Sequence, residues 1–231
     1  MANKFEETFT NIPDAIREKT NTSDTMTPSE MPDKIKSISG GLKYWFDTFK
    51  DSGYYFSHFA NLEALENLQF DDTENVRSME GMFYYSALYT APDFNTSKCT
   101  NMDYMFYYCS HITTIPLYDT SHVTSMDYMF GLCSHLVSIS LLDTSKVDSM
   151  KNMFYQCDEL TTIPQLNTNN VLNMDHMFDH CTSLTEIPLL NTTNVKSMIR
   201  MFNECTSLLS VPLLNMEKIQ TLHVCLMVVK L

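Results

Sequence analysis

The sequence predicts an α/β repeat solenoid in which each 24-residue coil supplies a short helix and a short parallel strand. Two observations carry this prediction. The dipeptide Met-Phe recurs along most of the chain, and one helix and one strand in so few residues cannot bury a core unless repeats stack. Successive Phe positions lie 23 residues apart once and then 24 apart four times, at Phe83, Phe106, Phe130, Phe154, Phe178 and Phe202.

The first part of each repeat is predicted to be the helix. In the repeat that starts at Val147, apolar residues are spaced by three, three, one and three positions, which places them on one helix face. These residues are Val147, Met150, Met153, Phe154 and Cys157. The residues just before them, Asp143 to Ser145, are types that cap helix N-termini.

The second part of each repeat is predicted to be the strand. In "LTTIPQL" (160–166), Leu160, Ile163 and Leu166 are expected to point inward. Pro164 lacks a backbone donor, so the strand should be short or irregularly paired. An Asn-Thr or Asp-Thr pair follows each strand and is expected to form a polar ladder along the stack.

The segment 1–54 differs from the repeats and is expected to be a small helical segment for attachment or oligomerisation that also caps the solenoid, which spans 55–231. In "MTPSEMPDKIKSISGG", Thr27 fits a helix cap, Pro28 the first turn and Glu30 a capping box. The apolar C-terminal "HVCLMVVKL" is interpreted as a cap, an interface or a truncated end.

Charge and hydropathy exclude several function classes. The net charge of −13 opposes binding to nucleic acid, whose phosphates are also negative. No apolar run is long enough to cross a membrane, and the N-terminus has no secretory signal pattern. We therefore expect no nucleic-acid partner, no membrane insertion, and synthesis in the cytoplasm without a signal peptide.

The chain has seven cysteines, and five of them occupy one repeat position: Cys109, Cys133, Cys157, Cys181 and Cys205. Cys99 takes the position of Val147, and Cys225 takes a Met position. Because every cysteine stands where a core residue belongs, we interpret the five as a buried structural ladder of reduced thiols. A catalytic nucleophile would be singular rather than one of five equivalents.

The histidines suggest a metal or catalytic site only at first sight. His176 and His180 are four residues apart, but their repeat positions elsewhere hold Tyr, Asn, Leu, Gln, Arg and Glu, as on a variable outer face. Two histidines without further converging ligands fall short of a metal site. The Ser-His pairs at 110–111 and 134–135 lack an orienting acid. We predict no catalytic residues, no cofactor and no metal.

Two features suggest binding. Seven tyrosines fall at outward positions of the predicted helices and form the candidate binding surface: Tyr84, Tyr85, Tyr104, Tyr107, Tyr108, Tyr128 and Tyr155. One strand position holds Leu117, Leu141, Leu189 and Leu213, with Asp93 and Gln165 in the other repeats. This second row is either core or an exposed stripe for an oligomer or a partner.

The unit "MFxxCxxLxxIPxLxTxxVxxM" resembles the BspA-like leucine-rich repeats of bacterial surface proteins, over about Phe59 to Leu226. The resemblance implies a leucine-rich-repeat-like solenoid that serves adhesion or ligand display. The N-terminal "IPDAIREKT…MTPSEMPDKIKSI" resembles a segment that precedes repeat domains in phage and prophage tail proteins.

These resemblances give three hypotheses. The first is a non-enzymatic receptor-binding protein of a phage tail, which is located in the virion and binds a host-surface protein, a glycan or other virion proteins. A homo-oligomer is one form in which it is expected to act. The alternative is a BspA-type adhesin at the bacterial cell surface. A hydrolase or metal enzyme is the third, and it predicts one irregular coil with converging polar groups, which the repeats do not show.

Overall fold

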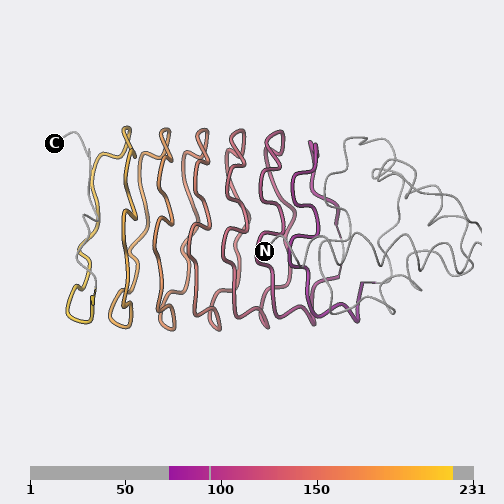
Figure 1. Cartoon of the computed structure of the whole chain (residues 1–231), viewed down its shortest axis with the longest axis horizontal. Helices are drawn as coiled ribbons and strands as arrows, with labels where there is room; N and C mark the ends of the chain where they lie inside the picture. Colours follow the sequence, from indigo (N-terminus) through magenta and orange to yellow (C-terminus); the bar gives the residue numbers. More distant parts are fainter. Residues whose placement is uncertain (1–72, 94, 221–231) are drawn as a thin grey trace, which may run out of the picture.

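The computed structural model describes residues 73–93 and 95–220. Within them the chain winds into coils that stand side by side along one axis, in sequence order (Figure 1). Five isolated parallel β-bridges join consecutive coils through one repeat position, occupied by Ser78, Asn101, Ser125, Ser149, Asn173 and Ser197. The chain is therefore a repeat solenoid, and the stacking predicted from the 24-residue period is present.

The predicted elements inside each coil are wrong, because the described residues contain no regular helix and no regular strand, only turns and isolated bridges. The segment 147–157, expected to be helical, instead carries most of the pairing between coils. The amides of Met150 and Asn152 donate to the carbonyls of Asn173 and Asp175 in the next coil, at 3.0 and 2.8 Å. Phe154 and Gln156 continue the same pattern.

The amides that lie between these donors close tight turns within their own coil. Met153 donates to the carbonyl of Met150, Tyr155 to that of Asn152, and Cys157 to that of Phe154, each three residues back. Alternate amides thus bind within the coil and between coils, so this segment satisfies its backbone without a helix. Its apolar spacing of three fits a run of three-residue turns as well as it fits a helix.

The distance between coils explains why no helix forms. Parallel pairing holds neighbouring backbones about 4.8 Å apart, whereas an α-helix with its side chains is about 10 Å wide. The stacked phenylalanine rings repeat every 5.4 to 5.9 Å, so the coils are close here as well as at the bridge. A helix in each coil would force the coils apart.

The turns place two residues of each coil in the left-handed backbone region. Eleven non-glycine residues have φ between 51° and 63°, and Gly81 has φ of 58°. A side chain in this region costs roughly 1–2 kcal/mol compared with glycine. In the coil that starts at Val147 these residues are Asn152 and Gln156, each the third residue of a turn, as in type II turns.

The core consists of rows of identical or similar side chains that run along the solenoid. Val, Met, Phe, Cys and Leu at the repeat positions are nearly all fully buried, and the six phenylalanines are the largest of them. Burying one such side chain stabilises the fold by about 1.5–3 kcal/mol. The expected inward positions Leu160, Ile163 and Leu166 are buried too, although they form no strand.

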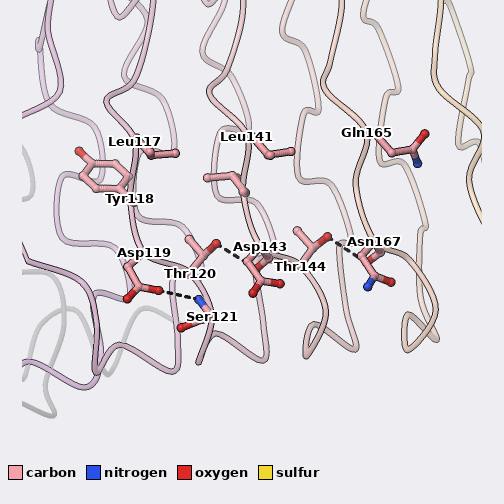
Figure 2. Close-up of a pocket in the computed structure, with 11 residues that line it drawn as sticks. Leu117, Tyr118, Asp119, Thr120, Ser121, Leu141, Asp143, Thr144, Gln165 and Asn167 are labelled. Atoms are coloured by element: carbon pink, nitrogen blue, oxygen red, sulfur yellow. Dashed lines mark hydrogen bonds between the residues drawn. The ribbon is translucent and has the colours of Figure 1, made fainter.

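The predicted Asn/Asp-Thr ladder is present on the side that follows Pro164. Buried Thr144 donates through Oγ1 to the carbonyl of Asn167 in the next coil at 2.9 Å. The Asp143 side chain accepts the amide of Ser145 at 2.9 Å, which closes the turn. Equivalent bonds recur in each coil, and Figure 2 shows two of the threonine bonds and one turn bond.

The left-handed turns can be distinguished from a helix by two substitutions at one residue. Gln156 has φ of 54°, and its side chain is half-buried. We expect Gln156→Gly to be more stable than Gln156→Ala by about 1 kcal/mol, because glycine alone carries no penalty there. In a helix the order is reversed by a similar amount. Urea unfolding of both variants measures the difference, and a more stable alanine variant would contradict the turn geometry.

Candidate functional site

The seven predicted tyrosines lie on the ladder of turns, in three neighbouring rows. The first row holds Tyr104 and Tyr128, the second Tyr84, Tyr107 and Tyr155, and the third Tyr85 and Tyr108. The first and third rows are the left-handed positions, whereas the second row lies between them. The tyrosines therefore project from rigid, paired backbone rather than from a helix surface.

Six of the seven rings form one continuous cluster, which we call the tyrosine ladder. Within each row, rings of neighbouring coils stack. The centroids are 4.7 Å apart for Tyr104 and Tyr128, 5.1 Å for Tyr84 and Tyr107, and 4.2 Å for Tyr85 and Tyr108. Edge contacts join the rows, including Tyr107 with Tyr128 at 5.8 Å. Such contacts contribute roughly 0.5–1.5 kcal/mol each and fix the rings in place.

Gly131 shapes the C-terminal edge of the ladder. It occupies the second-row position between Tyr107 and Tyr155, and a Cβ there would approach the Tyr107 ring to 3.0 Å. The Tyr107 ring therefore lies directly over the glycine backbone. Tyr155 continues the row beyond this gap, where its ring and that of His180 make a T-shaped contact with centroids 6.3 Å apart.

Some tyrosines of the ladder are partly buried, and others are exposed to solvent. Desolvation raises the pKa of Tyr84, Tyr107 and Tyr128 above the usual value, so these hydroxyls stay neutral at any physiological pH. Tyr85 and Tyr108 are the outermost rings, with 48% and 38% of their surface exposed. This surface offers flat aromatic faces with neutral hydroxyl groups, which suits contact with protein or sugar.

A row of acids borders the first tyrosine row, and sequence reasoning missed it. The carboxylate of Asp103 accepts the Ser125 hydroxyl at 2.6 Å and the Asp127 amide at 2.7 Å in the next coil. Asp127 and Asp175 repeat this arrangement. Desolvation raises the pKa of Asp103 to about 6, and it raises the pKa of Asp127 as well. The common repeat position of these acids was the available signal.

The five cysteines of the structural ladder are fully buried and free. Each thiol donates to the carbonyl of a phenylalanine in the preceding coil, as Cys157 does to Phe130 at 3.1 Å. Burial raises the pKa of Cys109 and Cys205 to about 12 and that of the other three well above the usual range. Such thiols do not form the thiolate that attack or metal binding requires. Cys225 lies outside the described residues.

The two histidines predicted to be surface residues share one buried carboxylate. Asp179 is 3% exposed, and its two oxygens lie 2.7 Å from Nδ1 of His176 and 2.7 Å from Nδ1 of His180. Asn203 donates to the same carboxylate at 2.7 Å. A carboxylate only accepts, so each Nδ1 carries the proton. The repeat pattern does not predict this bridge, because the position of Asp179 is held by Tyr, Gly and Asn in the other coils.

The Ser-His pairs are contacts between chain neighbours on the surface. Ser134 Oγ lies 3.2 Å from Nδ1 of His135, but that nitrogen also lies 2.6 Å from the carbonyl of Ser110. Because a carbonyl cannot donate, Nδ1 carries the hydrogen and cannot take a proton from Ser134. Across residues 73–93 and 95–220, no group of three or more His, Cys, Asp or Glu could hold a metal ion.

The second predicted row is an exposed stripe rather than core. Leu117, Leu141, Leu189 and Leu213 have 60% to 92% of their surface exposed, and Gln165 lies in the same row. The stripe borders an open groove of about 610 Å³, whose other wall is the Asn/Asp-Thr ladder (Figure 2). No helix in the described part of the chain is long and apolar enough to cross a membrane.

Taken together, these features define a class of protein: a parallel repeat solenoid with an aromatic face. The family model described as "Mycoplasma protein of unknown function, DUF285" matches residues 1–92, 50–160 and 134–227. The chain belongs to this family. Membership in it confirms the BspA-like repeat resemblance.

A search of the curated proteins finds no match. A leucine-rich repeat protein from Eubacterium ventriosum, known from a crystal structure, is similar with 16% identity and a TM-score of 0.44. The alignment covers 66% of this chain and 40% of that chain, so this chain spans less than half of its relative's length. No comparison supports the resemblance of the N-terminal segment to phage tail proteins.

The burial of the cysteine ladder can be tested by thiol labelling. The six cysteines that the structure describes are all buried, and Cys225 is the seventh in the chain. We expect no more than one thiol to react rapidly with an aromatic disulfide reagent in the native state, and all seven to react in denaturant. Rapid native labelling of several thiols would show that the ladder is open.

The acid row should give a pH signature. The folded-state pKa of Asp103, about 6, lies above its ordinary 3.8, so the folded state binds the proton more tightly. Its contribution to stability is therefore present at low pH and lost as pH rises through 6. The free energy of unfolding of Asp103→Asn, relative to that of the natural protein, should therefore increase by roughly 1–2 kcal/mol from pH 4 to pH 7. This figure allows for the partial exposure of the Asp103 side chain.

Urea unfolding at several pH values measures this difference. Asparagine keeps the oxygen that accepts the Ser125 hydroxyl and the Asp127 amide, so the bonds themselves survive the change. Asp119→Asn is a matched control, because hydrogen bonds from Ser121 lower the pKa of that exposed acid. The control should show the opposite trend, and a pH-independent effect of Asp103→Asn would contradict the assignment.

Proposed function

We propose that this protein is a non-enzymatic binding module of the BspA-type surface adhesin kind. The tyrosine ladder is its contact surface, and the partner is a surface protein or a glycan. Membership in a BspA-like repeat family supports an adhesion or protein-interaction role in general. The single observation that supports this choice of surface is the continuous stack of six tyrosines on neighbouring coils.

The geometry of the ladder suits binding in two ways. The rings are already ordered by stacking and by paired backbone, so a partner does not have to immobilise them, and less entropy is lost on association. Aromatic faces with hydroxyl tips bury a large area and also form hydrogen bonds, which is why tyrosine is common at the centres of interfaces.

Four of the seven tyrosines also occupy left-handed positions: Tyr85, Tyr104, Tyr108 and Tyr128. Glycine would be less strained at each of them, as Gly81 is at the start of the first row. Bulky rings at strained positions are consistent with a use for the side chains themselves. The non-tyrosine residues at the same positions in later coils show that the turn alone does not require a ring.

The absence of enzymatic activity is part of the proposal. It is supported by the high pKa of the thiols and by the blocked Nδ1 of His135. A phage-tail role remains the other sequence-based hypothesis. It depends on the segment 1–54, which lies outside the described residues, and no comparison supports it, so the adhesin role is preferred.

The proposal is tested by measuring binding of the fluorescently labelled full chain to intact bacterial and epithelial cells. The outermost rings, Tyr85 and Tyr108, are replaced together by alanine. We expect at least a ten-fold loss of affinity, because exposed aromatic residues at interface centres each contribute more than about 1 kcal/mol. Protease-treated and periodate-treated cells separate a protein partner from a glycan partner.

Tyr89→Ala is the matched control. Tyr89 is 56% exposed and contacts His111 rather than any ring of the ladder. The control should bind like the natural protein, and both variants should keep the natural unfolding midpoint within a few degrees. If the double variant bound cells as tightly as the control, the tyrosine ladder would not be the contact surface.

A further inference from the structure

The exposed leucine stripe has a symmetric order that the proposed function does not explain. Along the solenoid it reads Leu117, Leu141, Gln165, Leu189, Leu213. The two residues on each side of Gln165 are therefore the same when read in either direction. The leucines have 71%, 60%, 66% and 92% of their surface exposed, which is unusual for four residues in one row.

The polar row beside the stripe is not symmetric, because its charged and neutral residues lie at opposite ends. In the same five coils it reads Asp119, Asp143, Asn167, Asn191, Asn215. The acids lie in the first two coils and neutral amides in the last three. Hydrogen bonds from Ser121 and Ser145 lower the pKa of Asp119 and Asp143, so both are ionised at neutral pH.

We propose that this face binds a second copy of the chain, antiparallel, about a two-fold axis that passes through the coil of Gln165. Leu141 then meets Leu189 of the second copy, and Leu117 meets Leu213. Gln165, whose Nε2 donates to the Leu189 carbonyl of its own chain at 2.8 Å, meets its own equivalent on the axis through its amide oxygen. The interface is isologous, so each contact occurs twice.

The spacing of the coils favours a second copy over an extended peptide. Neighbouring stripe residues are one coil apart, about 4.8 Å. An extended strand presents side chains on one face only every 6.6 Å or so, because alternate residues point away. A peptide would therefore lose register within two coils, whereas a second copy has the same repeat and keeps register along the whole stripe.

Charge selects the antiparallel arrangement. Each chain carries a net charge of −13, so facing acids would oppose association. The antiparallel arrangement sets Asp119 against Asn215 and Asp143 against Asn191, and it places Asp93 beyond the end of the opposing stripe. A parallel arrangement aligned coil on coil would instead bring Asp93 of one copy against Asp93 of the other.

Gln165 sets the register of the pair. A shift of one coil would place the polar side chain of Gln165 against a leucine in both copies, and one polar residue in an apolar seam is enough to fix alignment. The stripe spans about 20 Å over five coils, which places the interface at the small end of specific contacts. The dimer should therefore exchange with monomer at low protein concentration.

Sedimentation velocity of the full chain over a range of concentrations tests association, with Leu141→Asp and Leu189→Lys as disrupting variants. Each single variant should weaken the dimer at least ten-fold, because it sets a charge against leucine at two contacts. The double variant should regain dimer, because Asp at 141 then faces Lys at 189 of the second copy. Leu172→Lys is the control, since lysine already occupies that row at Lys196.

Cysteine trapping tests the orientation. The described natural cysteines are buried, so an added surface thiol stands out from the background. Gln165→Cys should form a disulfide-linked dimer on mild oxidation. Leu117→Cys should do so only together with Leu213→Cys. A chain that is monomeric at every concentration, a dimer unaffected by Leu141→Asp, or cross-linking of Leu117→Cys alone but not Gln165→Cys would each overturn the proposal.

Discussion

The structure depends on one constraint, the short and constant step from coil to coil. Parallel backbone bonds hold the bridge position of each coil against the next, from Ser78 to Ser197. The phenylalanine rings repeat at nearly the same distance, so the step applies across the body of the coil. Any element wider than about 5 Å is excluded, which is why turns replace helices.

The same step determines how the polar groups of the core are satisfied. The carbonyl of Phe130 accepts both the Cys133 amide of its own coil and the Cys157 thiol of the next. On the other side of the coil, a buried threonine hydroxyl reaches the next carbonyl. A small residue with a donor is needed at both places, because a larger side chain would not fit between stacked coils. Cysteine and threonine therefore recur for packing and hydrogen bonding together.

Because the distance between coils is constant, the side chains at each surface position of the repeat form a row along the solenoid. The coils differ from one another in which residues fill these rows. In the first coils the turn face is aromatic. In the later coils the same positions carry His176, His180 and the buried Asp179 between them. A different segment of each coil carries the exposed leucines and the polar ladder. The character of each surface is therefore set by which side chains fill equivalent positions, while the backbone stays the same.

The 24-residue period is read directly from the sequence, and it determined the solenoid, the inward rows and the place of each cysteine. These follow from the sequence because burial repeats with the period regardless of backbone conformation. The expected helix failed at Val147 to Cys157, since an apolar spacing of three is shared by a helix and by successive turns. Only the distance between coils distinguishes them, and that distance is a property of the stack.

For the candidate surfaces too, some features follow from the sequence and others only from the tertiary structure. The sequence alone showed that tyrosines and leucines recur at set positions, and it left open whether the leucine row was core. The tertiary structure decided that Leu141 is exposed, that the tyrosine rings stack across coils, and that Asp179 joins two histidines. Each of these depends on contacts between residues a full coil apart or on the direction in which a turn points a side chain. Local sequence does not specify either quantity, because both are fixed only when one coil packs against the next.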